Sequence, residues 1–281
     1  MRAIWTFLIT VLVLLVVGGV VSAETPTAIV YVNVAATGAN NGTSWADAYT
    51  DPVTALAAIS TGEVWIAAGI YTPTAQIQLK NNVMLYGGFV GNETSLSERD
   101  IVANETVFQS GASIINGSNT DASAVVDGIT IQNGVGSRTD IAGEGGAGGG
   151  VFIDNGSPTF INCTIKDNQA QFGSGVFIRD GSPTFINCSF ISNISTRSGI
   201  GGAIYADTLN TAEQQLIITN SLFNYNTVWQ GAFTTGHGAG IYAASGVTLS
   251  VQKSNFYSNW SWHNNTFGNA TTGGAIAALG P

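Results

Sequence analysis

The chain has 281 residues, of which 44% are hydrophobic and 9% charged, and its formal net charge is −9. Eight Lys and Arg stand against 17 Asp and Glu, so there is no clustered basic face to neutralise phosphates, and we expect no nucleic-acid partner. Abundant Gly, Asn, Thr and Ser beside 10% aromatic residues exclude a disordered tract and favour many short strands joined by turns.

Residues 1–23 have the pattern of a secretory signal peptide. Arg2 precedes an apolar block over 3–21, and Ala23 stands before the polar Glu24, where cleavage is expected. An uncleaved N-terminal anchor is the alternative, because the block is just long enough to span a bilayer. We therefore expect a secreted protein, extracellular or on the outer surface of a bacterium, with no membrane span after signal removal.

The next segment, 24–110, reads as an N-terminal cap followed by the first coils of a repeat. The alternating run 28–34 predicts a strand, and the runs 63–69 and 82–88 predict strands stopped by glycines. Asp51 before Pro52 predicts the N-terminus of a helix over 52–60, with Val53, Leu56, Ala57 and Ile59 as its apolar stripe. We expect this helix to cover the open end of the repeat array.

A repeat, 25 residues long in its two clearest copies and longer afterwards because of inserted loops, organises the rest of the chain, 111–281. GGGVFIDNGSPTFINCTI (148–165) returns as GSGVFIRDGSPTFINCSF (173–190), and weaker copies follow at 201–206, 238–243 and 273–278. A fixed period of this size is typical of a solenoid, in which each repeat buries its apolar face against its neighbours. Since the last copy is followed by neither a closing strand nor a cap, we expect the repeats to be truncated at the C-terminus.

Several phrases resemble known β-helix proteins. SWADAY (44–49), VWIAAGIYTPT (64–74), LKNNVMLYGGFVGNETSLSERD (79–100) and VVDGITIQNG (125–134) resemble the head of bacterial secreted right-handed parallel β-helix repeat proteins. The GGAI-type and FxxN-type phrases resemble the repeats of chlamydial polymorphic outer membrane proteins. The resemblance implies an all-β, right-handed parallel β-helix with an N-terminal capping helix, the fold of the pectate lyases.

Alternation along the second half of the repeat predicts which side chains face the core. Ile161, Cys163 and Ile165 are expected to point inward, and Ile186, Cys188 and Phe190 to repeat this one coil later. An asparagine recurs three residues after an apolar position in each copy, which predicts a ladder of stacked amides at a turn, formed by Asn168, Asn193, Asn226 and Asn259.

Cys163 and Cys188 are the two cysteines of the chain, and stacking in register would bring them one strand spacing apart. We favour two stacked buried thiols, and a disulfide remains the alternative in an oxidising compartment. His237 and His263 lack partners at metal-site spacing, and the GxGxxG match at 143–148 is followed by a strand phrase instead of a helix. We expect no cofactor and no metal, with calcium entering only if the protein is a lyase.

The best catalytic cluster consists of Asp154, Arg179 and Asp180, with Asp154 and Arg179 at equivalent positions of consecutive coils. Opposite charges on neighbouring strands are usually a surface pair. We therefore expect no catalytic site and a non-enzymatic, adhesin-like protein that binds glycans or surface proteins along its lateral face. The alternatives are a polysaccharide lyase or hydrolase of the pectate-lyase type using these three residues, and a structural spacer. Further carboxylates are Asp121, Asp127, Asp140 and Glu144.

Aromatic residues cluster near the end of the chain, at Trp229, Tyr257, Trp260 and Trp262. We assign them to inserted loops of the last repeats, where they would cover the loop bases. Exposed rings beside Asn and Thr would instead suit sugar stacking or contact with a protein.

Overall fold

The computed structural model describes residues 28–136, 146–210, 213–230, 238–263 and 274–279. The predicted signal peptide lies outside these residues. In the part of the chain that is described, no helix combines the length and apolar character needed to cross a membrane.

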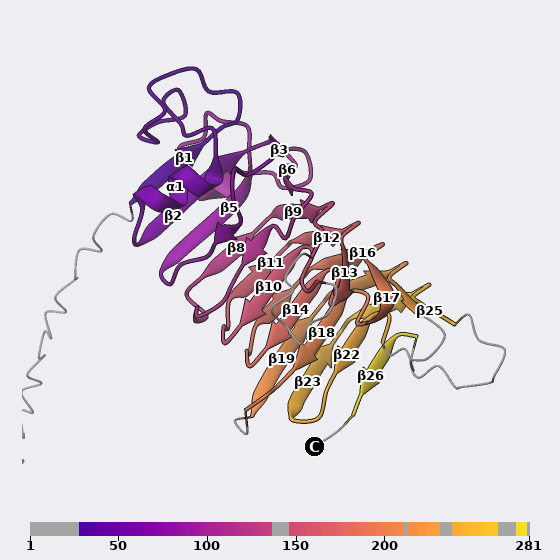
Figure 1. Cartoon of the computed structure of the whole chain (residues 1–281). Helices are drawn as coiled ribbons and strands as arrows, with labels where there is room; N and C mark the ends of the chain where they lie inside the picture. The colour runs from indigo at the N-terminus through magenta and orange to yellow at the C-terminus, as the bar shows by residue number, and fades with distance from the viewer. Residues whose placement is uncertain (1–27, 137–145, 211–212, 231–237, 264–273, 280–281) are drawn as a thin grey trace, which may run out of the picture.

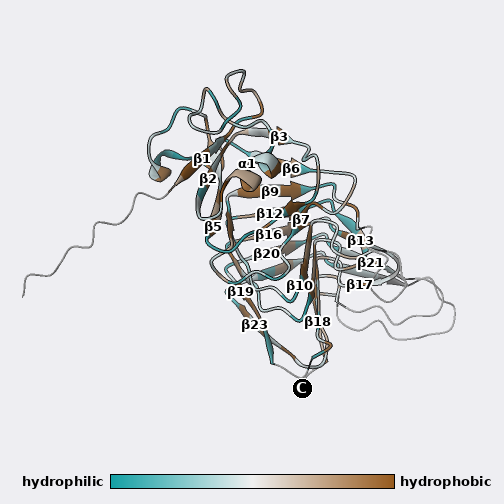
Figure 2. Ribbon diagram, turned by 60° about the vertical axis from the view of Figure 1, so that its left-hand side comes forward, coloured by the Kyte–Doolittle hydropathy of each residue, from teal (hydrophilic) through white to brown (hydrophobic). Residues whose placement is uncertain are grey.

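The chain winds as a right-handed parallel β-helix, the hand that parallel crossovers take almost without exception (Figure 1). Three long parallel sheets form the walls of the coil, and a shorter fourth sheet continues one side. Figure 2 shows two of these walls, sheets A and C, on either side of the third, sheet B. The predicted fold class is confirmed.

The sheets are named A to D, and the strands of each are given from the N-terminal end. Sheet A contains β1 (Ile29–Val32), β2 (Gly62–Ala67), β5 (Val83–Phe89), β8 (Val125–Asp127), β11 (Thr159–Ile161), β15 (Thr184–Ile186), β19 (Gln214–Thr219) and β23 (Val247–Gln252). Sheet B contains β3 (Gly69–Tyr71), β6 (Thr106–Gln109), β9 (Ile129–Gln132), β12 (Thr164–Lys166), β16 (Ser189–Ile191), β20 (Leu222–Asn224) and β24 (Asn255–Tyr257).

Sheet C forms the third wall and contains β4 (Ile77–Gln78), β7 (Ile115–Asn116), β10 (Val151–Asp154), β14 (Val176–Arg179), β18 (Ile204–Asp207), β22 (Ile241–Ala243) and β26 (Ile276–Ala278). Sheet D contains β13 (Gln169–Phe172), β17 (Ile194–Ile200), β21 (Thr227–Gln230) and β25 (Trp260–His263). The sheets pass residue 110 without a break, because β7 pairs with both β4 and β10.

Helix α1 (Pro52–Ala58) covers the N-terminal end, as predicted. Asp51 caps it by accepting a hydrogen bond from the backbone N–H of Val53. The helix contacts β1, β2 and β4, which are the first strands of sheets A and C. Its buried side chains include Ala55 and Leu56, whereas Ala57, predicted on the apolar stripe, is exposed. A short 3-10 helix, η1 (Leu96–Glu98), lies in the loop after β5.

The glycines at the end of the run 82–88 do not stop a strand. Strand β5 continues through Gly87 and Gly88 to Phe89, and its register with β2 shifts there. Gly88 has a φ of 96°, and a side chain at this position would meet Ile101. The glycines therefore allow an irregularity within the strand and a close approach of the following loop.

Residues that are 25 positions apart in the two clearest repeats pair with each other on consecutive coils. Val151, Phe152 and Ile153 pair with Val176, Phe177 and Ile178. The next phrase repeats this, because Thr164 pairs with Ser189 and Ile165 with Phe190. Identical side chains therefore stack from coil to coil, as the rings of Phe160 and Phe185 do at 5.1 Å.

The predicted inward positions need one correction, at Ile161 and Ile186. Ile161 is half-buried and Ile186 exposed, while the preceding Phe160 and Phe185 are buried in the core. The reason is a turn between sheets A and B, where Asn162 and Asn187 have left-handed φ values of 51° and 55°. The turn interrupts the alternation, so Cys163 and Ile165 point inward as predicted, but the isoleucines before it do not.

The predicted asparagine ladder is confirmed. The amide Nδ2 of Asn168 donates to the backbone oxygen of Ile131 and to the Oδ1 of Asn193, and Asn193 and Asn226 repeat the pattern on the following coils. These three amides are completely buried. Each satisfies backbone groups at the turn between sheets B and D, where unpaired polar groups would be costly.

Cys163 and Cys188 are free, buried thiols, as we favoured. The thiol of Cys163 contacts the backbone oxygens of Ile161 and Val126, at 3.2 Å and 3.4 Å. Burial, together with the neighbouring Cys163, raises the pKa of the Cys188 thiol well above its ordinary value. Both cysteines therefore behave as small core residues.

Candidate binding surface on sheet C

The outer face of sheet C carries two rows of side chains that follow from the register of its strands. The first row runs Gln78, Asn116, Phe152, Phe177, Tyr205 and Tyr242. The second row contains Asp154, Arg179 and Asp207 on three consecutive coils. The chemistry of this face therefore changes along the axis, from amides near the N-terminal end to rings and charges further on.

The amide half of the face is hollowed into an open groove of about 580 Å³. It lies over β4, β7 and the turns that follow these strands, beside the end of β10. Its lining is almost entirely polar and consists of Gln78, Leu79, Lys80, Asn81, Asn116, Ser118, Asn119, Thr120, Asp154 and Asn155.

Neighbouring groups hold the amides of the groove in fixed orientations. Gln78 donates from Nε2 to the backbone oxygens of Leu79 and Ser118, at 3.2 Å and 3.4 Å. Asn116 accepts from the Ser118 N–H at 3.0 Å, and Asn155 donates to the Oδ1 of Asn119 at 3.2 Å. A carboxamide has two donor hydrogens and an acceptor oxygen, so Gln78 keeps its oxygen, and Asn116 and Asn119 keep donor hydrogens, for a ligand.

The ammonium group of Lys80 serves the fold at the rim of the groove. It donates to the backbone oxygens of Leu56 and Ile59, at 2.5 Å and 3.0 Å. These carbonyls lie at the C-terminal end of α1, where a cation compensates the unpaired oxygens and the helix dipole. Lys80 therefore ties the capping helix to sheet C.

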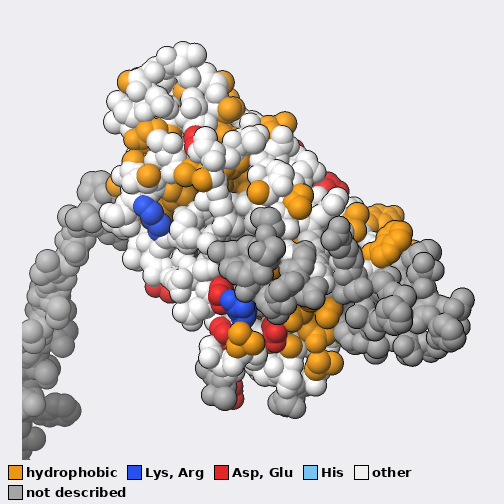
Figure 3. Space-filling model, in the orientation of Figure 1, with side chains coloured by type: hydrophobic (Ala, Val, Ile, Leu, Met, Phe, Trp, Pro, Cys, Tyr) orange, Lys and Arg blue, Asp and Glu red, His pale blue; other side chains and the backbone are white. Residues whose placement is uncertain are grey.

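Asp154 and Arg179 form the predicted pair between consecutive coils. Arg179 donates from Nε to one carboxylate oxygen of Asp154 at 3.1 Å and from Nη2 to the other at 2.5 Å. Figure 3 shows a basic side chain among acidic ones near the position of β14 in Figure 1. A two-point pair of this geometry fixes both side chains and engages the Arg179 guanidinium.

Asp180 does not join this pair in a catalytic arrangement. Its Oδ1 accepts hydrogen bonds from the Thr208 hydroxyl and from the backbone N–H groups of Leu209 and Asn210, at 2.9 to 3.1 Å. Burial alone would raise the pKa of Asp180, but these bonds and the nearby Arg179 together lower it. The carboxylate of Asp180 organises the loop after β18, so the three predicted residues do not converge on one reacting centre.

From the strands of the charged pair onward, the first row is a ladder of stacked rings. Phe152, Phe177, Tyr205 and Tyr242 follow one another at 5.3, 5.4 and 5.2 Å between ring centres. The Tyr205 hydroxyl donates to Asp207, and burial, followed by the charge of Asp207, raises the pKa of this phenol. Ala147 and Phe172 pack against the ladder, so it belongs to a second small core outside sheet C.

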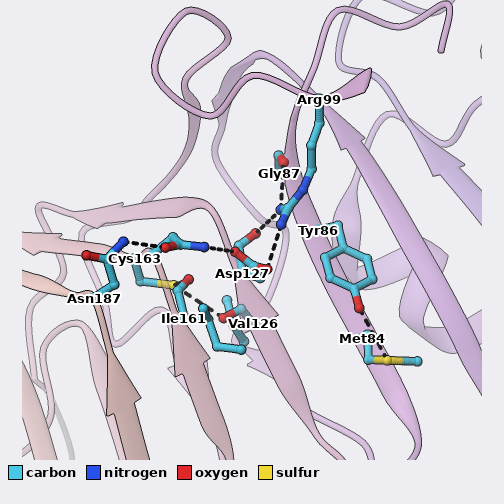
Figure 4. Close-up of polar contacts among 10 residues, drawn as sticks. Met84, Tyr86, Gly87, Arg99, Val126, Asp127, Ile161, Cys163 and Asn187 are labelled. Carbon is cyan, nitrogen blue, oxygen red and sulfur yellow. Dashed lines mark hydrogen bonds and ion pairs between the residues drawn. The ribbon is translucent and has the colours of Figure 1, made fainter. Parts of the chain in front are cut away.

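The remaining described carboxylate candidates are also used by the fold. Asp127 pairs with Arg99 at 2.6 Å and accepts from Asn162, which accepts in turn from Asn187 (Figure 4). Asp121 caps the turn at Ser123. Asp140 and Glu144 lie outside the described residues.

The described part of the chain contains no group of three or more His, Cys, Asp and Glu side chains placed to hold a metal ion. His237 and the first part of the GxGxxG match, 143–145, lie outside the described residues. His263 is in β25, but its side chain is not among those described.

The aromatic cluster near the C-terminal end is not in inserted loops. Trp229 lies in β21, Tyr257 in β24, and Trp260 and Trp262 in β25. Trp229, Tyr257 and Trp260 are exposed, so they do not cover loop bases, and a further exposed ring, Tyr225, was missed by the sequence analysis. The repeat could have indicated that Tyr225 is exposed, because Tyr225 occupies the same turn position as Ser192 and Ser258 in the neighbouring coils.

No protein-family model matches the chain, and no curated protein is similar to it in sequence. Two solved structures are similar to it in shape. A pectin methylesterase from Aspergillus niger is 17% identical with a TM-score of 0.40, over 89% of this chain and 93% of that one. The pectate lyase Pel9A is 16% identical with a TM-score of 0.34, over 91% of this chain and 83% of that one.

Proposed function

We propose that this protein is a non-enzymatic, adhesin-like protein of the cell surface or extracellular space, and that it binds glycans in the groove on sheet C. The observation that carries the proposal is the amide-lined groove of about 580 Å³ on a rigid lateral face. Ligand sites built on strands hold their polar groups more precisely than sites built on loops.

Glycans fit this lining better than other ligands of similar size. Each sugar hydroxyl both donates and accepts hydrogen bonds. The carboxamides of the groove offer the same combination together, with the Gln78 oxygen as an acceptor and the Asn116 and Asn119 amides as donors. Lys80 and Arg179, the cations in and beside the groove, are engaged by helix carbonyls and by Asp154. A glycan without carboxylate or sulfate groups is therefore the favoured class.

The alternative, a polysaccharide lyase or hydrolase that uses Asp154, Arg179 and Asp180, requires at least one of these groups to take or give a proton. Arg179 is held at two points by Asp154, and Asp180 is held by the loop at 208–210. Releasing them would remove contacts that order the surface, which favours the binding function. Calcium enters the chemistry only under this alternative.

The predicted signal peptide supports a location outside the cytoplasm. The likeness of the GGAI-type and FxxN-type phrases to the repeats of chlamydial polymorphic outer membrane proteins supports a displayed protein. A parallel β-helix suits this role because it presents one continuous face along its whole length.

A glycan array followed by a depolymerisation assay on purified residues 24–281 tests the proposal. We expect binding to neutral glycans without release of new sugar ends, with and without calcium. Binding should weaken about tenfold in the Gln78→Ala/Asn116→Ala variant, a loss of about 1.4 kcal/mol. It should be unchanged in Gln252→Ala, an exposed glutamine on sheet A.

Two results would contradict the proposal. If no glycan on the array loses affinity in the double-substituted variant, the groove is not a binding site. Calcium-dependent formation of unsaturated sugar ends, lost in Arg179→Ala, would establish the lyase instead.

A further inference from the structure

Exposed aromatic rings in the described residues are confined to two consecutive coils. Tyr225, Trp229, Tyr257 and Trp260 are exposed by 57%, 52%, 57% and 60%, whereas the other Phe, Tyr and Trp side chains described are buried or half-buried. We call these four residues the aromatic stripe. Large exposed rings gathered in one place on a surface mark an interaction site more often than scattered ones do.

The stripe follows the chain around the corner between sheets B and D. Tyr257 pairs with Asn224 in sheet B, and Trp260 pairs with Thr227 in sheet D. Tyr225 occupies the turn between the two sheets, with a left-handed φ of 55°. In Figure 3, hydrophobic side chains gather in the region that Figure 1 labels β25, which is consistent with this placement.

These rings are not needed to fill the interior of their coils. Inside the same two coils, Phe223 and Phe256 stack at 4.5 Å, and the Asn226 and Asn259 amides close the corner. The core therefore has its own aromatic residue in each coil, and the stripe adds apolar area on the outside. Covering that area with a ligand would be favourable, because buried aromatic rings dominate recognition surfaces.

The neighbouring side chains define the chemistry of the ligand. The segments 220–230 and 254–262 contain no Asp, Glu, Lys or Arg, so the stripe is set in an uncharged strip of sequence. Asn224 and Thr227 are paired with Tyr257 and Trp260, and Ser258 follows Tyr257 at the turn, so amide and hydroxyl groups lie beside the rings. A ligand that matches this surface is neutral, with flat apolar faces edged by hydroxyl groups.

We propose that the aromatic stripe is a second carbohydrate site, at which a chain of neutral pyranose units stacks on Trp260, Tyr257 and their neighbours. It lies on sheets B and D and is separate from the groove on sheet C. The two coils are about 4.8 Å apart. Their rings are staggered, because Tyr257 pairs with Asn224 and Trp260 with Thr227, so a sugar chain that spans both coils meets rings of each.

Isothermal titration of purified residues 24–281 with neutral hexasaccharides of glucose, mannose and xylose tests this site. We expect at least one of them to bind, and binding to weaken about tenfold in Trp260→Ala and in Tyr257→Ala, as for aromatic anchors of other interfaces. Leu209→Ala, which removes an exposed apolar side chain outside the stripe, should leave binding unchanged. The titrations are repeated in the Gln78→Ala/Asn116→Ala background, so that the groove and the stripe are measured separately.

The proposal fails if none of the three hexasaccharides binds in that background, or if binding there persists in Trp260→Ala. It also fails if sedimentation shows a dimer of this chain that Trp260→Ala dissociates, because the stripe would then contact a second copy.

Discussion

The N-terminal part of the described chain, 28–110, which we call the head, and the last coils are both rich in aromatic residues. The aromatic side chains of the two regions lie in different environments. In the head, Trp65 and Phe89 are buried and stack at 4.8 Å, and Tyr31 and Trp45 contact each other at 4.8 Å. Tyr31 and Trp65 alternate with the inward residues of sheet A, so these rings lie outside the main core. Trp45, from the loop after β1, packs there on Tyr31 and Phe89. In the last coils the outward rings stay exposed. Outward rings therefore stabilise the head, whereas in the last coils they are available for recognition.

The largest expected effect is the loss of a ring from the head. Phe89→Ala removes a completely buried side chain that contacts Trp45 and Trp65. We expect it to reduce the free energy of unfolding by about 3–5 kcal/mol, because the cavity cannot be filled by neighbouring rings. Urea unfolding followed by far-ultraviolet circular dichroism measures this. A loss below about 1 kcal/mol would mean that this buried ring cluster does not stabilise the head.

The interior of the last coils should be the next most sensitive. Asn226→Ala leaves the backbone oxygen of Phe190 and the N–H of Asn193 without their side-chain partner. We expect a loss of about 2 kcal/mol or more in the same urea experiment, because buried unpaired groups are costly. Asn224→Ala, on the outside of the same coil, is the matched control and should have little effect.

A smaller effect should appear in the head as the pH is lowered. Burial tends to raise the pKa of Glu93, but hydrogen bonds from the N–H groups of Val90, Gly91 and Asn92 lower it overall. Glu93 therefore stabilises the head fully above its unfolded pKa of about 4.3, and this contribution is lost as the pH falls through the lower folded pKa.

Thermal unfolding between pH 6 and pH 3 checks this contribution. The melting temperature should fall less steeply with pH in Glu93→Gln than in the unaltered protein. Equal slopes would show that the Glu93 carboxylate does not order this loop.

The smallest effect should come from the aromatic stripe. Trp260→Ala removes a large side chain, yet we expect the free energy of unfolding to change by less than about 0.5 kcal/mol, as for other surface substitutions. This result, set beside Phe89→Ala, would separate rings that hold the fold from rings that face solvent. A loss comparable to that of Phe89→Ala would place Trp260 in the core and contradict the comparison.

Much of the fold could be predicted because the repeat copies itself. The register of Val151 with Val176, the burial of Cys163 and Cys188, the asparagine ladder and the N-cap at Asp51 all follow from residue types at fixed spacing. The inward positions failed at Ile161 and Ile186, because a left-handed residue breaks the alternation. Asparagine tolerates the left-handed conformation, so its recurrence at 162, 187 and 220 could have indicated a turn at this point of each coil.

The surfaces could not be predicted to the same degree. The pairing of Arg179 with Asp154 followed from the 25-residue displacement, but the loop held by Asp180 depends on contacts 28 to 30 residues away. The groove combines side chains of β4 and β7 with the turns beyond them, and no single repeat contains it. The outward direction of Trp229 and Trp260 depends on where each corner falls in the coil.

The exact register between coils also bears on how such a molecule changes over evolutionary time. The two 25-residue units that begin at 148 and 173 meet through nearly identical side chains, so a tandem duplication of the DNA for one of them would insert a coil whose contacts already exist. Every added copy would lengthen the solenoid by about 4.8 Å and would need no new kind of contact between coils. The length of the solenoid is then a trait that unequal recombination can change in small, uniform increments.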